Sequence, residues 1–146
     1  MAGIIVGIDG SHHSERALKW AVNEAVLRQT PLTVLSVRQV IRGWAGPDAG
    51  PYPGDAELVE QTRAAAQAAT DEVLATLSGQ RPEVIVKAIT GVPAETLVAA
   101  TADADMIVVG SRGSGGFERL TMGSVGDQVA RHARCPVVII PHEKKS

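Results

Sequence analysis

Short apolar runs alternate with longer amphipathic stretches along the whole chain. Apolar runs bounded by glycine, proline or polar residues predict buried strands, and apolar residues at helical spacing predict helices between them. The predicted strands are Ile4–Ile8, Leu32–Val37, Glu83–Ile89, Asp105–Val109 and Pro136–Ile140. The first predicted helix begins near Ser11 or Ser14. The other three predicted helices are Asp55–Leu77, Pro93–Ala102 and Ser124–His132. Strict alternation of the two elements predicts an α/β fold with a parallel sheet and right-handed crossovers.

Composition narrows the kind of core that this fold can have. Of 146 residues, 45% are hydrophobic but only 3% are aromatic, so Val, Ile, Leu and Ala must build the core. Such a mixture suits a buried parallel sheet covered by alanine-rich helices. In the third predicted strand, Lys87 shares a face with Ile85 and Ile89, which predicts an edge of the sheet. The length fits one domain, which we expect to span residues 1–146.

Charge and hydropathy argue against nucleic acid and membranes as partners. The formal net charge is -2 and the largest basic cluster is the pair Lys144 and Lys145, so the basic patch of a nucleic-acid binder is missing. No apolar run approaches the ~20 residues of a membrane-spanning helix, and Asp9 interrupts the first run before a secretory signal could form. The lone Cys135 excludes an intramolecular disulfide, so we expect a cytoplasmic protein and a buried, unreactive thiol.

The segment from Val108 to Val125 carries five glycines in eighteen positions. It follows a predicted strand and leads into the helix that begins at Ser124. Free N–H groups at a helix N-terminus favour an anion such as phosphate, and glycines let the backbone wrap around a ligand. If the first and fourth strands are neighbours, this segment, Asp9 and Val37 converge on one crevice beyond the carboxyl ends of the strands.

Other motifs of catalysis and phosphate binding fit the sequence poorly. A Walker A loop needs a lysine before its Ser or Thr, and the stretch before Ser124 has none. The dinucleotide fingerprint should follow the first strand, where GIDGSHHS has the wrong glycine spacing. His12 and His13 are adjacent and cannot form the metal pair that lies four residues apart on a helix. No spacing predicts a catalytic triad or paired carboxylates.

At these glycines the sequence resembles the universal stress protein family. The family's nucleotide signature is a glycine, two residues, a glycine, nine residues, then glycine and Ser or Thr. It stands here as Gly110, Gly113, Gly123 and Ser124. Supporting matches are the first strand ending at Asp9 and the segments GVPAETL, DMIVVGSRG and HARCPVVII. The resemblance covers nearly the whole chain.

The resemblance implies a doubly wound, five-stranded parallel sheet in the order 3-2-1-4-5, with helices on both faces. It implies binding of ATP, or of AMP, ADP or cyclic AMP, with Mg²⁺ accompanying a triphosphate. The adenosine portion would contact Gly7, Ile8, Asp9 and Val37. The ribose and phosphates would contact Gly110, Arg112, Gly113, Gly123, Ser124 and Val125. A homodimer through the strand Val137 to Ile140 is also implied.

The favoured function is that of a regulatory or stress-response nucleotide binder. A weak ATPase or phosphotransferase and a nucleotide-free interaction module are the alternatives. Asp127 stands three residues after Ser124, so the Ser124 hydroxyl could hold phosphate or form a capping box with Asp127. The Gly- and Pro-rich segment Arg38 to Gly54 is either a lid over the nucleotide or an ordinary surface loop.

Overall fold

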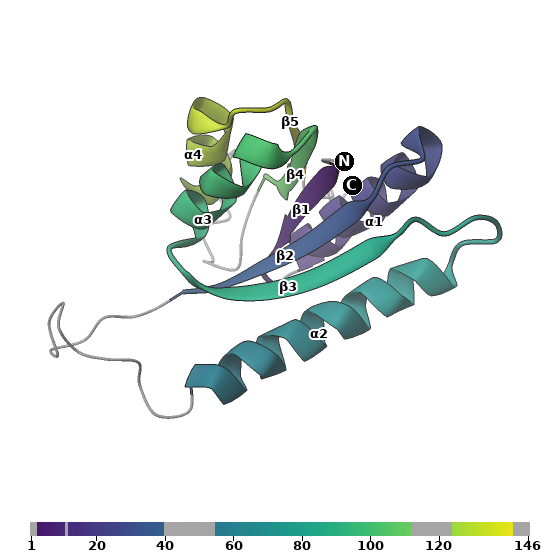
Figure 1. The fold of residues 1–146 in the computed structure, drawn as a ribbon, viewed down its shortest axis with the longest axis horizontal. Coiled ribbons are helices and arrows are strands. Elements are labelled where there is room, and N and C mark those ends of the chain that lie inside the picture. The colour runs from purple at the N-terminus through teal and green to yellow at the C-terminus, as the bar shows by residue number, and fades with distance from the viewer. Residues whose placement is uncertain (1–2, 11, 40–54, 112–123, 142–146) are drawn as a thin grey trace, which may run out of the picture.

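The computed structural model describes residues 3–10, 12–39, 55–111 and 124–141 (Figure 1). Its strands are β1 (Ile4–Ile8), β2 (Leu32–Gln39), β3 (Val84–Gly91), β4 (Met106–Gly110) and β5 (Val137–Ile140). Its helices are α1 (His12–Arg28), α2 (Asp55–Ala75), α3 (Pro93–Ala100), the short 3₁₀ helix η1 (Thr101–Asp103) and α4 (Ser124–His132). All strand pairs are parallel and the order is β3-β2-β1-β4-β5, which confirms the predicted fold class.

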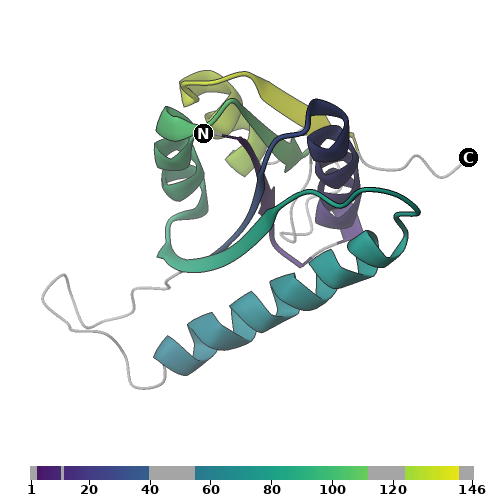
Figure 2. The ribbon, with the colours of Figure 1, turned by 45° about the vertical axis from the view of Figure 1, so that its right-hand side comes forward.

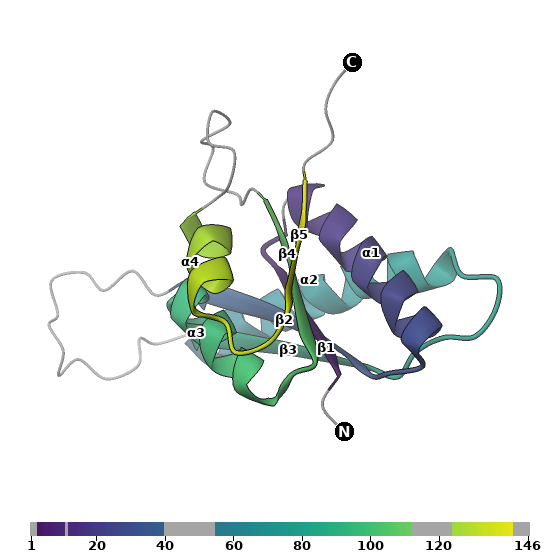
Figure 3. The ribbon, with the colours of Figure 1, turned by 90° about the horizontal axis from the view of Figure 1, so that it is seen from above.

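Helices cover both faces of the sheet, as predicted for a doubly wound fold. Figure 3 shows α1 and α2 on one side of the strands and α3 and α4 on the other. Figure 2 shows the long helix α2 running beside β3. Two hydrophobic clusters result, one on each face of the sheet. Among the described segments, no helix combines the length and the apolar character that crossing a membrane requires.

The observed elements differ from the predicted ones only at their ends. Strand β2 runs on to Gln39 because β3 pairs with it as far as Gly91. Helix α2 stops at Ala75 rather than Leu77. The N–H groups of Thr76 and Leu77 donate to carbonyls three residues back, at 3.0 and 3.1 Å, which is the tighter pattern that closes a helix. The third predicted helix likewise ends at Ala100 and continues as η1.

The edge position predicted from Lys87 is confirmed. Strand β3 is the outermost strand on its side of the sheet. Its Val84 and Val86 pack on the cluster under α2, whereas Ile85 and Ile89 on the opposite face are 46% and 41% exposed. Helices α3 and α4 therefore leave one face of β3 open.

Candidate functional site

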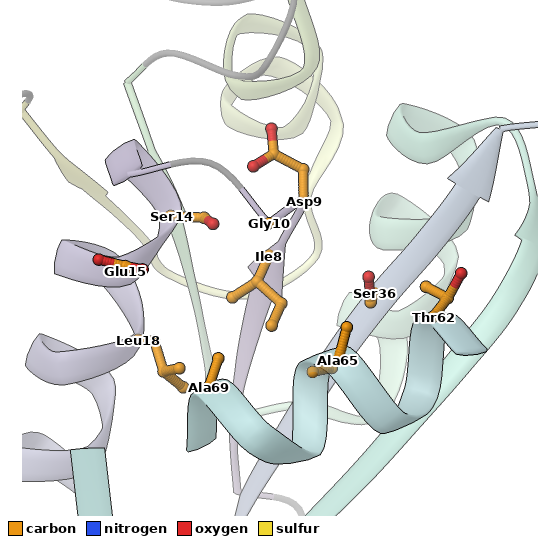
Figure 4. A pocket seen from close by; sticks show the side chains of 11 residues that line it. Ile8, Asp9, Gly10, Ser14, Glu15, Leu18, Ser36, Thr62, Ala65 and Ala69 are labelled. Carbon is orange, nitrogen blue, oxygen red and sulfur yellow. The ribbon is translucent and has the colours of Figure 1, made fainter. Parts of the chain in front are cut away.

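A pocket of about 260 Å³ lies at the carboxyl ends of β1 and β2, between α1 and α2 (Figure 4). Strand β1 contributes Ile8 and the two residues that follow it, Asp9 and Gly10. Ser36 comes from β2. The pocket is therefore at the end of the sheet where open parallel sheets bind their ligands.

The local backbone brings α1 to this strand end. Gly10 has φ +83°, a left-handed conformation that glycine adopts without strain. The chain can therefore turn directly from β1 into α1, which begins at His12. The first turns of α1 then place Ser14, Glu15 and Leu18 along the pocket wall.

Strand alternation explains why Ser36 faces the pocket. Leu32 and Val34 are fully buried under α1 and α2, and Ser36 is the next residue on the same face. Ser36 is the register partner of Ile8, so both strand ends meet at the pocket. Only 6% of Ser36 is exposed.

Helix α2 forms the remaining wall. Its pocket residues are Thr62, Ala65, Ala66 and Ala69. Spacings of three and four residues put all of them on one helix face. Except for Thr62, that wall has no side chain larger than a methyl group. The Arg38 guanidinium donates to Asp55 at 3.2 Å and so connects the end of β2 to the start of α2.

The structure brings only some of the predicted site residues together. Ile8 and Asp9 line the pocket. The position of Gly7 faces α3 instead, because a Cβ there would lie 3.0 Å from both methyl carbons of Leu97. Val37 and Val125 pack against the hydrophobic cluster under α3 and α4.

The other predicted residues belong to the β4 to α4 connection. Gly110 ends β4 in register with Ile140, and Ser124 is the first residue of α4. Arg112, Gly113 and Gly123 lie outside the described residues. The possible lid segment is Arg38 to Gly54; its first two residues belong to β2, and residues 40–54 lie outside the described residues. Asp127, the alternative partner of Ser124, accepts a hydrogen bond from Arg131 Nε at 3.3 Å. One turn of α4 thus holds this carboxylate next to a cation.

Sequence reasoning missed most of the pocket wall: Gly10, Ser14, Glu15, Leu18, Ser36, Thr62, Ala65, Ala66 and Ala69. The sequence did carry one signal for the pocket wall, because Ser36 is a polar residue on the otherwise apolar face of the second predicted strand. The small residues of α2 also follow helical spacing, but that pattern is typical of any packed helix.

The pocket is lined by both apolar and polar side chains. Asp9 and Glu15 supply carboxylates, whereas none of the 11 described lining residues is basic. A lining of this kind suits a ligand that has apolar surface and a polar edge. Helix α4 begins at Ser124, and the dipole of a helix favours negative charge at its N-terminus.

Cys135 lies away from the pocket, partly buried against the cluster under α3 and α4. Burial raises the pKa of its thiol, the Asp105 carboxylate raises it further, and a backbone hydrogen bond with Ile107 lowers it. A raised pKa leaves less thiolate at neutral pH, in line with the expected unreactive thiol.

Comparison with known proteins points to one family. The family model described as "Universal stress protein family" matches residues 2–141. Universal stress protein Rv2623 of Mycobacterium tuberculosis is 37% identical over 144 residues, which cover 94% of this chain and 44% of the relative. The chain thus spans about half the length of the curated relatives it matches.

Solved structures agree with this assignment. Universal stress protein UspA from Lactobacillus plantarum has a TM-score of 0.73 and 29% identity, and the match covers 95% of this chain and 97% of that one. A universal stress protein in complex with cAMP has a TM-score of 0.60 and 25% identity, with 97% and 98% covered.

Proposed function

The chain belongs to the universal stress protein family, and from this premise we propose that it binds an adenine nucleotide and acts as a regulatory protein in the stress response. The observation that carries the proposal is the pocket at the carboxyl ends of β1 and β2, which includes Asp9. This is the position at which open parallel sheets bind nucleotides. The similar structure in complex with cAMP supports an adenine nucleotide as the ligand class.

We favour ATP among the adenine nucleotides. The glycine signature leads into α4 at Ser124, and free N–H groups at a helix N-terminus bind phosphate. Gly110, Gly113, Gly123 and Val125 would support the phosphates through backbone groups, and Arg112 is a further candidate. Mg²⁺ would enter with the triphosphate, whose oxygens are ligands that this ion prefers. AMP, ADP and cyclic AMP are the alternatives.

The proposal is one of binding and regulation rather than turnover. Phosphoryl transfer needs cations and a positioned base around the transferred group. The described pocket residues supply two carboxylates and hydroxyl groups, but no Lys or Arg. A weak ATPase is therefore the second candidate, and the cytoplasmic location stays a prediction.

We further propose a homodimer through β5. Val137 to Ile140 form an outermost strand of apolar residues. Such an edge is prone to pair with another strand, and a second copy related by a two-fold axis would cover it.

Calorimetric titration with ATP, AMP and cyclic AMP tests the proposed function. We expect the wild-type protein to bind at least one of them. Gly113→Val should weaken binding of ATP at least about tenfold, because a branched side chain blocks close approach of the backbone to the phosphates. Gly79→Val is the control, because Gly79 lies beyond α2 at an exposed position where an added Cβ meets nothing within 4 Å. An absence of binding heat for all three nucleotides would overturn the proposal. Sedimentation velocity on the same samples tests the dimer.

A further inference from the structure

The C-terminal end of β5 is hydrogen-bonded to two segments of the proposed nucleotide site, the first turn of α1 and the end of β4. We propose that these contacts couple occupancy of the nucleotide site to pairing of β5 in the dimer, and that Arg16 is the residue through which α1 acts on β5. This inference rests on the proposed nucleotide binding and the proposed dimer, and it states how one regulates the other.

The first contact comes from α1. Arg16 Nη1 donates to the carbonyl oxygen of Pro141 at 2.7 Å, and Pro141 directly follows the last residue of β5. Figure 3 shows the start of α1 beside this end of β5. Ser14 and Glu15, which line the pocket, immediately precede Arg16 on the helix. A ligand that contacts this turn therefore helps to fix the position from which Arg16 donates.

The second contact comes from the end of β4. The N–H group of Ser111 donates to the carbonyl oxygen of Ile140 at 2.9 Å. Ser111 is buried and directly follows Gly110, the first glycine of the signature. The backbone that would support the phosphates is thus continuous with the backbone that bonds to the end of β5.

The side chain of Ile140 adds packing to these two hydrogen bonds. It belongs to the same hydrophobic cluster as Ile8 and Leu18, which both line the pocket. The other three residues of β5 are only half-buried. The end of β5 is therefore the part of this strand that is most closely connected to the pocket.

Strand β5 depends on few partners for its position. It has four residues, and among the described strands only β4 pairs with it. In a two-fold dimer its outer edge has to align with the same edge of the second copy. Contacts that fix the end of β5 favour this alignment, so bound nucleotide should strengthen the dimer. Because such coupling is reciprocal, the dimer should also bind nucleotide more tightly by the same factor.

The test measures the dissociation constant of the dimer by sedimentation, without nucleotide and with saturating ATP and Mg²⁺. We expect ATP to lower this constant for the wild-type protein by about fivefold or more, as is typical of coupled sites. Arg16→Met keeps an unbranched side chain but removes the donor to Pro141. The effect of ATP on its dimer should therefore fall to less than about twofold.

Lys19→Met is the matched control. Lys19 is exposed one turn further along α1, so the variant removes one positive charge from the same helix and keeps the hydrogen bond to Pro141. Methionine and lysine have similar helix propensities, so both variants should fold. Lys19→Met should respond to ATP as the wild type does. Arg16→Lys retains an N–H donor and should recover part of the response.

Hydrogen exchange in β5 provides a second readout if the dimer does not dissociate at measurable concentrations. ATP should slow exchange of the β5 amides in the wild type and in Lys19→Met, and slow it less in Arg16→Met. This readout reports the order of β5 itself.

Equal responses of Arg16→Met and Lys19→Met to ATP would overturn the role of Arg16. A wild-type dimer that binds ATP without any change in its dissociation constant or in β5 exchange would overturn the coupling, while the proposed function stands. Wild-type protein that binds no nucleotide would instead overturn the proposed function. Protein that binds ATP but stays monomeric would overturn the dimer and, with it, the coupling.

Discussion

On both faces of the sheet, small residues let a helix approach the strands closely, but the two faces place these residues on different elements. Under α1 the small residues are on the helix, where Ala17, Ala21 and Ala25 are fully buried. Under α3 the small residue is on the strand, because Gly7 leaves room for Leu97. A long helix can face the sheet with a row of alanines, because its many turns together still bury enough apolar surface. A short helix has to bury a large side chain such as leucine to gain the same apolar contact. The strand then needs a glycine at the position where that side chain packs.

The faces also differ in how much of the sheet they cover. Helices α1 and α2 have 17 and 21 residues, whereas α3 and α4 have 8 and 9. Helix α2 of the long pair packs along β3, whereas α3 of the short pair approaches β3 only at its end, at Gly91. The uncovered strip includes Ile85, Lys87 and Ile89. A lysine between two isoleucines makes this edge a poor template for pairing with another chain.

The largest expected effect is on the free energy of unfolding, and it is tested by truncating one residue on each face of the sheet. Leu32 is fully buried under α1 and α2, and Leu32→Ala should lower the free energy of unfolding by about 2–5 kcal/mol. Ile85 is 46% exposed on the other face, so Ile85→Ala should cost less than about 1 kcal/mol. Urea denaturation measures both. Similar losses would mean that the open face of β3 is covered in solution.

The next largest effect on stability is expected at Gly7, where Leu97 of α3 lies close to β1. Gly7→Val would push branched methyl groups toward Leu97, and overpacking of this kind costs about 1–3 kcal/mol. Combining it with Leu97→Ala frees that space. The double variant should therefore be more stable than the sum of the single losses predicts, by about 0.5–3 kcal/mol in a denaturation cycle.

The same variant decides between two roles of Gly7. The family resemblance implies that Gly7 lines the wall around the adenosine, and the structure places it against α3. If Gly7→Val keeps full stability but weakens nucleotide binding, the role in the ligand wall is correct. Lost stability with coupling to Leu97 assigns the glycine to packing.

The fold was predictable because each strand and helix carries its own local pattern. Strand β1 and helix α4 match the prediction to the residue. The pocket was harder to predict, because Ser36 and Ala65 are far apart in sequence and meet only when α2 lies over β2. Strand alternation also separates Ser36 from Val37, since adjacent residues point to opposite faces. The glycine signature concerns the β4 to α4 connection, and its predicted contacts stay predictions.

The smallest expected effect is on the rate at which the Cys135 thiol is alkylated. This rate reports how well α3 and α4 shield their face of the sheet from solvent. Burial and the Asp105 carboxylate raise the pKa of this thiol, so less thiolate exists at pH 7 than for a free cysteine. Iodoacetamide should therefore alkylate Cys135 more slowly than it alkylates an unstructured peptide. Asp105→Asn removes one cause of the shift, and the rate should rise by less than about tenfold. A wild-type rate equal to that of the peptide would show that this face is open at β5, unlike the sealed core under α1.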